Sequence, residues 1–406
     1  MAVIKDIFQE TKHRFLNFFV LDAINKAGHE KKYFLASRAE SIDALKIVTG
    51  KNTPDGVTIF ALYGEQRDRV VLVRQYRYPI NRFVYEFPSG IIDPGETYRE
   101  AAIREMMEET GLVFTGMPVD AMYEEPRFQT IGMTDESCAI VYGFAEGMPT
   151  SEGEEEGEEI EVVIADREEV RRILREEYMA SVCAYQLAHF LYDSDPFAFV
   201  RPEALIFDVD GTLWDAADAM ARGWTKVINE NYDPDYYIDG DGIRPVLGQP
   251  PEGLAAHLFP DLDDETRLAR FHVCAAGELP VIAAESPDVY AGFREILPRL
   301  AERFKLFIVS NCDAGYIEMF LETTGLEEYF SGHLCPGDTG EWKADNIRTV
   351  MRENGIERAV YIGDTENDRL ASAEAGVPFV FASYGYGNVS VSCPEIGKPA
   401  DLMKIF

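Results

Sequence analysis

Short apolar runs separated by turn residues characterise the first half of the chain. Their β-branched and aromatic residues are typical of strands. We expect these strands at residues 57–64, 69–77 and 138–145. One helical pattern interrupts them, from Thr97 to Thr110. Thr97 and Glu100 fit a capping box at its start, and Gly111 is a typical helix end. A strand running into a helix follows at residues 159–174, and a last helix at 179–192.

In the second half, three apolar runs each end at polar residues. These are run 204–207 before Asp208, run 306–309 before Ser310, and run 359–362 before Gly363 and Asp364. Helical patterns separate the runs. This alternation predicts a parallel, doubly wound sheet that binds ligands at the carboxyl ends of its strands.

Two features divide the chain. The stretch 193–196, followed by Pro202, is typical of a linker, so we expect one domain at residues 1–196 and another at 197–406. The segment from Asp215 to Leu300 lies between the first two runs of the second half and is too long for a simple crossover. We therefore expect an inserted, mostly helical cap at about residues 215–295.

Composition agrees with two packed globular domains, because 46% of the 406 residues are apolar and 12% are aromatic. The net charge of −34 argues against binding to nucleic acid or an anionic membrane, since both need a basic surface. It would also repel phosphorylated substrates unless divalent cations reverse the charge locally. The six cysteines are scattered and no run approaches about 18 apolar residues, so we expect a reduced, cytoplasmic protein without a membrane span.

The expected helix at 97–110 carries candidate metal ligands. Glu105 and Glu109 lie four residues apart and therefore on one face, flanked by Arg104 and Glu108. Such neighbouring carboxylates repel each other unless a hard cation binds them, and they suit Mg²⁺, with Mn²⁺ as the alternative. A bound ion would bridge the protein and a pyrophosphate and activate a water molecule. The competing interpretation is a solvated acidic helix face.

The segment from Gly90 to Leu112, GIIDPGETYREAAIREMMEETGL, resembles the Nudix box of hydrolases that cut nucleoside diphosphates linked to another moiety. Residues 86–90 (EFPSG), 74–77 (RQYR) and 131–136 (IGMTDE) are similar to the ADP-ribose pyrophosphatase branch of that family. The resemblance implies an α/β/α sandwich with a mixed sheet. It also implies a homodimer with exchanged N-terminal strands, in which the apolar segment 15–20 faces the partner or, equally, belongs to the core.

The same resemblance implies roles for individual residues. Metal would bind to Glu105, Glu109 and the Ser89 carbonyl, Glu108 would act in catalysis, and substrate would contact Arg77 and Glu86. Family members carry a catalytic glutamate on a loop that corresponds here to residues 152–161. The match indicates Glu156 as the base and Glu158 as a metal ligand. The many glutamates also allow a shifted register, and a merely solvated loop is the alternative.

The second half begins with Asp208-Val209-Asp210-Gly211-Thr212, which resembles the first motif of the haloacid dehalogenase (HAD) superfamily. In this chemistry the first aspartate attacks phosphorus and forms an aspartyl-phosphate. The second protonates the leaving oxygen and later deprotonates water. Gly211 lets the backbone turn so that both carboxylates reach the same phosphate.

The other HAD motifs follow in the family's order. The resemblance assigns substrate binding to Ser310, Asn311 and Thr212, charge balance in catalysis to Lys343, and metal binding to Asp208, the Asp210 carbonyl, Asp364 and Asp368. Lys305 and Lys398 lie outside a suitable motif. The resemblance also implies a Rossmann-like parallel sheet with an α-helical cap, as in phosphoglycolate phosphatase-like enzymes. Trp214 either lines the cap entrance or packs in the core.

Together the motifs indicate a bifunctional, Mg²⁺-dependent hydrolase of small phosphorylated molecules. The Nudix half is expected to cleave ADP-ribose to AMP and ribose 5-phosphate, with NADH, FAD and GDP-mannose as alternatives. The HAD half is expected to act on a small phosphoester, and AMP, ribose 5-phosphate and phosphoglycolate are open candidates. The competing hypothesis is a Nudix half that senses nucleotide sugars and regulates the phosphatase. No complete Walker loop or dinucleotide glycine fingerprint is present, which disfavours a kinase or dehydrogenase.

Overall fold

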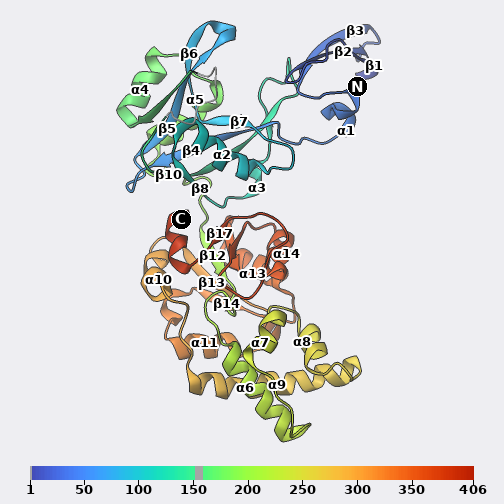
Figure 1. Ribbon diagram of the computed structural model, residues 1–406, viewed down its shortest axis with the longest axis vertical. Helices are drawn as coiled ribbons and strands as arrows, with labels where there is room; N and C mark the ends of the chain where they lie inside the picture. The colour runs from blue at the N-terminus through green and yellow to red at the C-terminus, as the bar shows by residue number, and fades with distance from the viewer. Residues whose placement is uncertain (1, 151–158) are drawn as a thin grey trace. The chain divides into compact units, whose positions relative to one another are not determined.

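The computed structural model describes residues 2–150 and 159–406 (Figure 1). Contacts divide the chain into two compact units, of which the front unit ends at Phe199 and the back unit continues from Val200 to Phe406. This division lies close to the boundary expected at residues 196 and 197, which as a domain boundary stays a prediction. No helix within these described ranges has the length and apolar character that a bilayer span requires.

A mixed sheet is the frame of the front unit. Its strands are β4 (Gly56–Tyr63), β5 (Arg69–Arg77), β6 (Arg82–Glu86), β7 (Ser89–Ile91), β8 (Val113–Gly116), β9 (Arg127–Phe128), β10 (Ser137–Glu146) and β11 (Ile160–Ala165). Strands β4 and β10 pair in parallel, whereas β5, β7 and β8 pair with their neighbours in antiparallel register. The expected strands and the mixed sheet are thus confirmed.

Helices cover both faces of this sheet. They are α2 (Tyr98–Thr110), α3 (Ala121–Glu124), α4 (Arg167–Glu176) and α5 (Ser181–Tyr192), whereas the short helix α1 (Lys46–Thr49) lies beside the N-terminal strands (Figure 1). Alternate residues of β4 point to opposite faces. Ile59 belongs to the apolar cluster that includes Met106 of α2, whereas Phe60 stacks on Phe87. The backbone N–H of Phe87 donates to the sulfur of Cys183 in α5, so α5 lies on the second face.

A smaller antiparallel sheet precedes the mixed sheet. It contains β1 (Val3–Gln9), β2 (Asn17–Ile24) and β3 (Glu30–Ser37). One face is covered and buries Phe19 and Leu35, whereas the other leaves Phe18 and Phe34 exposed in the single chain. The segment 15–20 is therefore divided between core and surface, and the homodimer stays a prediction.

A parallel sheet is the frame of the back unit. Its order is β14 (Gly332–Leu334), β13 (Lys305–Val309), β12 (Ala204–Phe207), β15 (Ala359–Gly363), β16 (Phe379–Ala382) and β17 (Glu395–Ile396). The strands β12, β13 and β15 are neighbours, so the residues that follow them meet at one edge. The helices beside this sheet are α10 (Phe293–Ala301), α11 (Tyr316–Thr324), α12 (Pro336–Thr339), α13 (Lys343–Asn354), α14 (Glu366–Ala375) and α15 (Leu402–Ile405). This is the expected Rossmann-like arrangement.

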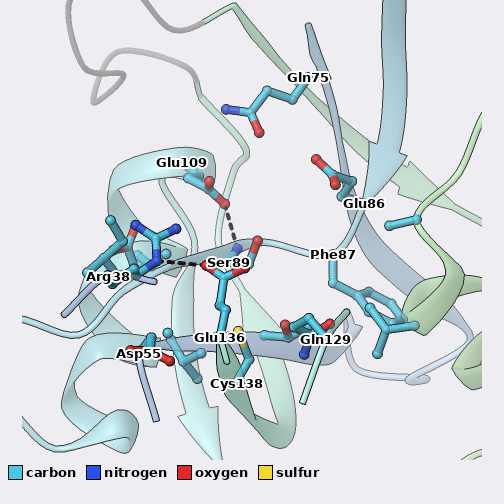
Figure 2. Close-up of a pocket in the computed structure, with 18 of the residues that line it drawn as sticks. Arg38, Asp55, Gln75, Glu86, Phe87, Ser89, Glu109, Gln129, Glu136 and Cys138 are labelled. Carbon is cyan, nitrogen blue, oxygen red and sulfur yellow. Dashed lines mark hydrogen bonds and ion pairs between the residues drawn. The ribbon is translucent and has the colours of Figure 1, made fainter. Parts of the chain in front are cut away.

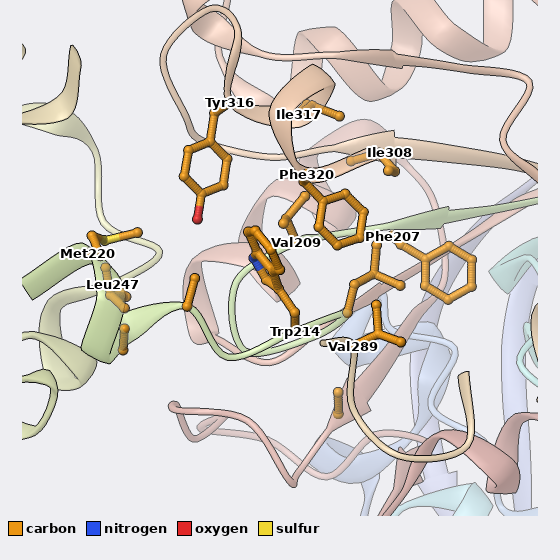
Figure 3. Close-up of a cluster of buried hydrophobic side chains, with 14 of the residues drawn as sticks. Phe207, Val209, Trp214, Met220, Leu247, Val289, Ile308, Tyr316, Ile317 and Phe320 are labelled. Carbon is orange, nitrogen blue, oxygen red and sulfur yellow. The ribbon is translucent and has the colours of Figure 1, made fainter. Parts of the chain in front are cut away.

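A helical insert separates β12 from β13 along the chain. It contains α6 (Ala217–Asn231), α7 (Gly240–Ile243), α8 (Pro251–Leu258) and α9 (Asp264–Glu285), as expected for a cap. Helices α6 and α9 lie side by side (Figure 1). Gly223 permits this close approach, because a Cβ there would lie 2.7 Å from the Cα of Glu278. Cap and sheet share one apolar cluster, in which Trp214 packs edge-on against Phe320 (Figure 3).

Candidate active sites

Helix α2 of the front unit is aligned by its two ends. The Thr97 hydroxyl accepts a hydrogen bond from the Glu100 N–H at 3.2 Å, and the Glu100 carboxylate accepts one from the Thr97 N–H at 2.8 Å. This is the expected capping box. Gly111 ends the helix in the left-handed region with φ of 69°. With both ends fixed, Glu105 and Glu109 face strand β7.

Both carboxylates converge on the backbone of Ser89 and Gly90. The Ser89 N–H donates to the Glu109 carboxylate at 3.0 Å (Figure 2). At Gly90 an added Cβ would lie 1.9 Å from the carboxyl of Glu105. Glycine is required at position 90 because Glu105 occupies the space of a side chain. The helix and β7 thus bring together the carboxylates of Glu105 and Glu109 with the Ser89 backbone.

Arg104 organises the acidic residues around this point. Its guanidinium lies 2.8 Å from Glu96, 2.8 Å from Glu105 and 3.0 Å from Glu108. The hydrogen bond from Arg104 lowers the pKa of Glu96, and the pKa of Arg104 is raised in return, first through Glu96. Glu108 is the outermost of these residues, with 48% of its side chain exposed. It is therefore available to a water or substrate in the cavity.

A cavity of about 980 Å³ opens beside these carboxylates. Arg77 and Glu86 both line it and form an ion pair at 2.7 Å. A second pair, Arg38 and Glu136, also lines the wall at 2.7 Å (Figure 2). Glu136 lies in the segment 131–136 that the sequence singled out, but nothing in the sequence linked it to Arg38.

The donor set at the front site suits a hard cation. Two carboxylates and a neighbouring main chain supply oxygen ligands of the kind that Mg²⁺ takes in proteins. Glu156 and Glu158 lie outside the described residues, so their assignment as base and ligand stays a prediction.

In the back unit, a buried lysine joins two of the predicted aspartates. The ammonium of Lys343, at the start of α13, lies 2.8 Å from Asp208 and 2.5 Å from Asp368. Each side chain is at most 3% exposed. Burial opposes the charge of Lys343, but the carboxylates of Asp208 and Asp368 prevail and raise its pKa well above the ordinary value. Lys343 is therefore a permanent cation beside the predicted nucleophile.

Asp210 is held by two neutral donors. The Tyr316 hydroxyl donates to its carboxyl at 2.7 Å and the Trp214 indole N–H donates to the same oxygen at 3.1 Å. Burial raises the pKa of Asp210 to about 7. A carboxyl with this pKa can donate and accept a proton near neutral pH. Trp214 is fully buried in the core (Figure 3), and its hydrogen bond to Asp210 also positions that carboxyl.

A group of carboxylates at the same edge is suited to a divalent ion. Oxygens of Asp208, Asp364 and Asp368 lie within 4.8 Å of one another. The Tyr386 N–H donates to Asp364 at 2.7 Å, and burial raises the pKa of Asp364 well above its usual range. Because Lys343 supplies a single positive charge to these buried acids, a divalent cation bound between them would balance the remaining charge.

Asp368 has a second task in the fold. It occupies the third position of α14, where its carboxylate accepts a hydrogen bond from the Thr365 N–H at 3.0 Å. The Asp368 N–H donates in return to the Thr365 hydroxyl at 3.2 Å, which completes a capping box, and that hydroxyl also donates to the Asp368 carboxylate at 2.7 Å. With Lys343 as a further partner, Asp368 has less freedom to bind metal than Asp364.

The predicted substrate-binding residues lie close to Asp208. The buried hydroxyl of Ser310 hydrogen-bonds to Asp208, and the buried amide oxygen of Asn311 has no partner within the described chain. Such an amide oxygen is satisfied by a ligand or by water. The Thr212 hydroxyl donates instead to Asp364 at 3.3 Å. This bond positions Asp364, a candidate metal ligand, and the substrate-binding role expected of Thr212 stays a prediction.

Several residues of this site escaped sequence reasoning. Tyr316 and Tyr386 belong to loops and helix starts that carry no motif. Glu278 had a visible signal, because it falls in register with the buried residues of α9, which are Phe271, Cys274, Ala275 and Ile282. A glutamate on the apolar face of an amphipathic helix is unusual and indicates a functional or paired carboxyl.

The comparisons with known proteins agree with this division. Residues 52–185 match the NUDIX domain, and residues 205–382 match the haloacid dehalogenase-like hydrolases. A phosphoglycolate phosphatase of Rhodospirillum rubrum is 31% identical over 208 residues, which are 47% of this chain and 83% of that protein. A nudix hydrolase of Caenorhabditis elegans is 46% identical over 88 residues, which are 21% of this chain and only 38% of that protein.

A haloacid dehalogenase-like hydrolase structure from Streptococcus pneumoniae aligns with 21% identity and a TM-score of 0.44, covering 50% of this chain and 97% of that one. The family matches fall on the two halves in which the acidic sites lie. The chain thus belongs to the haloacid dehalogenase-like hydrolases through its back unit and carries a Nudix domain in its front unit, and it is a bifunctional hydrolase.

Proposed function

We propose that the front site hydrolyses ADP-ribose to AMP and ribose 5-phosphate and that the back site removes phosphate from a small phosphomonoester, both with Mg²⁺. The observation that carries the proposal is the convergence of carboxylates at each site. Glu105 and Glu109 meet the Ser89 backbone beside the large cavity, and Asp208, Asp364 and Asp368 meet beside Lys343. Mn²⁺ is the alternative ion at both sites.

At the front site the reaction is the attack of water on one phosphorus of the diphosphate. A bound divalent ion would neutralise the charge that develops on the phosphoryl oxygens. Glu105 and Glu109 would hold that ion, while Glu108 or a glutamate of the segment 152–161 would take the proton of the water. The bridging P–O bond then breaks, and the two monophosphates leave. Arg77 and Glu86 line the cavity where the remainder of the substrate would lie.

At the back site the Asp208 carboxylate attacks phosphorus and the ester P–O bond breaks. Asp210 gives its proton to the leaving alkoxide, which departs as an alcohol. In the second step Asp210 takes a proton from water, and the resulting hydroxide attacks the aspartyl-phosphate. The P–O bond to Asp208 breaks and inorganic phosphate leaves. Lys343 holds the nucleophile in place throughout.

The direct test is to supply full-length protein with ADP-ribose and Mg²⁺ and to separate the products by chromatography. Wild type and Asp208→Asn should both cleave ADP-ribose, AMP and ribose 5-phosphate should accumulate with Asp208→Asn, and cleavage should be nearly absent with Glu109→Gln. The same assay with NADH, FAD and GDP-mannose ranks the alternative substrates. If no nucleotide in this panel is cleaved, the front-site proposal is wrong and a sensing role for the Nudix domain gains support.

A second proposal concerns the fusion of the two hydrolases. We infer that the back site consumes a product of the front site, because both monophosphates of the first reaction are phosphoesters. Wild type should then release inorganic phosphate from ADP-ribose, whereas Asp208→Asn should stop at the monophosphates. Phosphate release undiminished by that substitution would reject the sequence of reactions, and two unrelated activities would remain.

A further inference from the structure

A small cavity lies between the cap and the catalytic aspartates of the back unit. Its volume is about 50 Å³, and Asp208, Asp210 and Ser310 lie at its floor. The cap closes it with Trp224 of α6 and with Phe271 and Glu278 of α9. A phosphate bound at Asp208 would therefore direct its alcohol toward these cap residues.

Glu278 is the unexpected member of this lining. It is 5% exposed, and its carboxyl accepts a hydrogen bond from the indole N–H of Trp224. Gly223 fixes its backbone, because α6 approaches so closely that a Cβ at this glycine would meet the Cα of Glu278. Burial raises the pKa of Glu278 well above its usual value. Burying a carboxyl costs folding free energy, and a role in binding a ligand would account for such a residue at this place.

The charge of the lining excludes one class of ligand. Arginine, lysine and histidine are absent from the residues that line this cavity in the described part of the chain. Asp313 also lines the cavity. His272 of α9 lies 3.2 Å from Asp313 but is not one of the lining residues. A leaving alcohol with a carboxylate would place its negative charge beside the acidic side chains of Glu278 and Asp313, in a lining whose described residues include no arginine, lysine or histidine, and would oppose the ionisation of Glu278 further.

The same lining favours a hydrogen-bond donor. The Glu278 carboxyl can accept from a hydroxyl or an ammonium group, and the rings of Trp224 and Phe271 supply apolar and π surface around it. We propose that Glu278 is a specificity-determining residue that selects phosphomonoesters whose alcohol carries a hydroxyl or ammonium donor and no negative charge. This inference rests on the proposed phosphatase activity of the back site.

Three phosphomonoesters of nearly equal length test the proposal, because they differ only in the group beyond the ester. These are 2-hydroxyethyl phosphate, phosphoethanolamine and phosphoglycolate. Full-length protein with Mg²⁺ should give a kcat/KM at least about 10-fold higher for one of the first two than for phosphoglycolate. Which of the two is better distinguishes the hydroxyl donor from the ammonium donor.

Substitution of Glu278 should change this ranking. Glu278→Gln keeps an oxygen for Trp224 and offers an amide N–H to a carboxylate, so the preference against phosphoglycolate should shrink by about 10-fold. Glu285→Gln is the matched control, since Glu285 ends the same helix in an ion pair with Arg222 outside the cavity. It should leave the ranking unchanged.

The outcomes separate the inference from the proposed function. Phosphoglycolate as the best of the three substrates for wild type overturns the role of Glu278, and this result needs no variant. A ranking unaffected by Glu278→Gln, in a variant with a normal unfolding transition, overturns it as well. If neither these esters nor p-nitrophenyl phosphate release phosphate in an Asp208-dependent way, the phosphatase proposal itself is wrong.

Discussion

The two sites of this chain gather carboxylates in opposite surroundings. At the front, the partly exposed Arg104 of α2 pairs with Glu96, Glu105 and Glu108 beside a cavity of about 980 Å³. At the back, Lys343 lies buried between Asp208 and Asp368 beneath a cavity of about 50 Å³. Exposed ion pairs add little to folding, whereas losing one partner of a buried pair is costly. Substitutions at the front site can therefore abolish activity while the unit stays folded. At the back site, substitutions of the buried pair should lower both activity and stability.

The sharpest way to test the independence of the sites is Asp208→Asn. The amide cannot form an aspartyl-phosphate, so phosphate release from a phosphomonoester should fall at least about 10³-fold. Nucleotide cleavage at the front site should stay within about twofold of wild type, since no step there involves Asp208. Parallel assays of both activities on one preparation measure this. A fall of both activities together would contradict two separate sites.

The buried lysine should show the largest effect on folding. Lys343→Met leaves Asp208 and Asp368 buried without their cation, which should cost about 3–5 kcal/mol of unfolding free energy. The three tryptophans, Trp214, Trp224 and Trp342, all lie in the back unit, so their fluorescence during urea unfolding reports that unit alone. A variant as stable as wild type would show that the buried charges are balanced in another way.

Substitutions of the neighbouring glutamates Glu108 and Glu109 in α2 should differ in their effect on nucleotide cleavage. Glu109 is 7% exposed and bound to the Ser89 N–H, so Glu109→Gln should lower nucleotide cleavage by at least about 10²-fold. Glu108 has 48% of its side chain exposed, and Glu108→Gln should cost less than about 10-fold. Steady-state kinetics with ADP-ribose compare the pair. Equal losses would mean that Glu108 takes a more direct part in the reaction than its place suggests.

The smallest effect concerns the stability of the cap. The folded-state pKa of Glu278 is raised above the ordinary 4.5, so the folded chain binds this proton more tightly than the unfolded chain. Stability should therefore fall as pH rises above about 4.5 toward the folded-state pKa. Glu278→Gln removes this loss and should stabilise the back unit by about 1 kcal/mol at pH 8, with less gain at pH 5. Tryptophan-detected unfolding at both pH values, with Glu285→Gln as control, measures the gain. A destabilised variant at pH 8 would contradict it.

Local signals explain what the sequence could predict. The capping box at Thr97 and Glu100, the spacing of Glu105 and Glu109, and the aspartate after an apolar run are all read within a few residues. These signals mark the start of a helix or the end of a strand. In the structure the capping box and both glutamates belong to α2, and Asp208 directly follows β12.

Other features of the sites depend on contacts between distant segments. Arg38 meets Glu136, and Tyr316 meets Asp210, across loops whose paths no local pattern specifies. Glu278 combines both kinds of feature. The helical period of α9 indicates that it lies on the buried face, but its partner Trp224 belongs to another helix and has no local signal. Sequence reasoning therefore reaches the candidate catalytic and metal-binding residues more easily than the partners that position them.

The capping box of α14 joins the start of a helix to the charge network of the back site. Asp368 closes the first helical turn with Thr365 and at the same time holds Lys343. Because a lost helix cap costs about 1 kcal/mol and a buried lysine without its partner costs more, substitutions of Thr365 or Asp368 should lower the yield of folded protein in a library screened for soluble expression. A survey of tolerated substitutions would then classify Thr365 and Asp368 as residues needed for folding, and any effect of these residues on turnover would be missed.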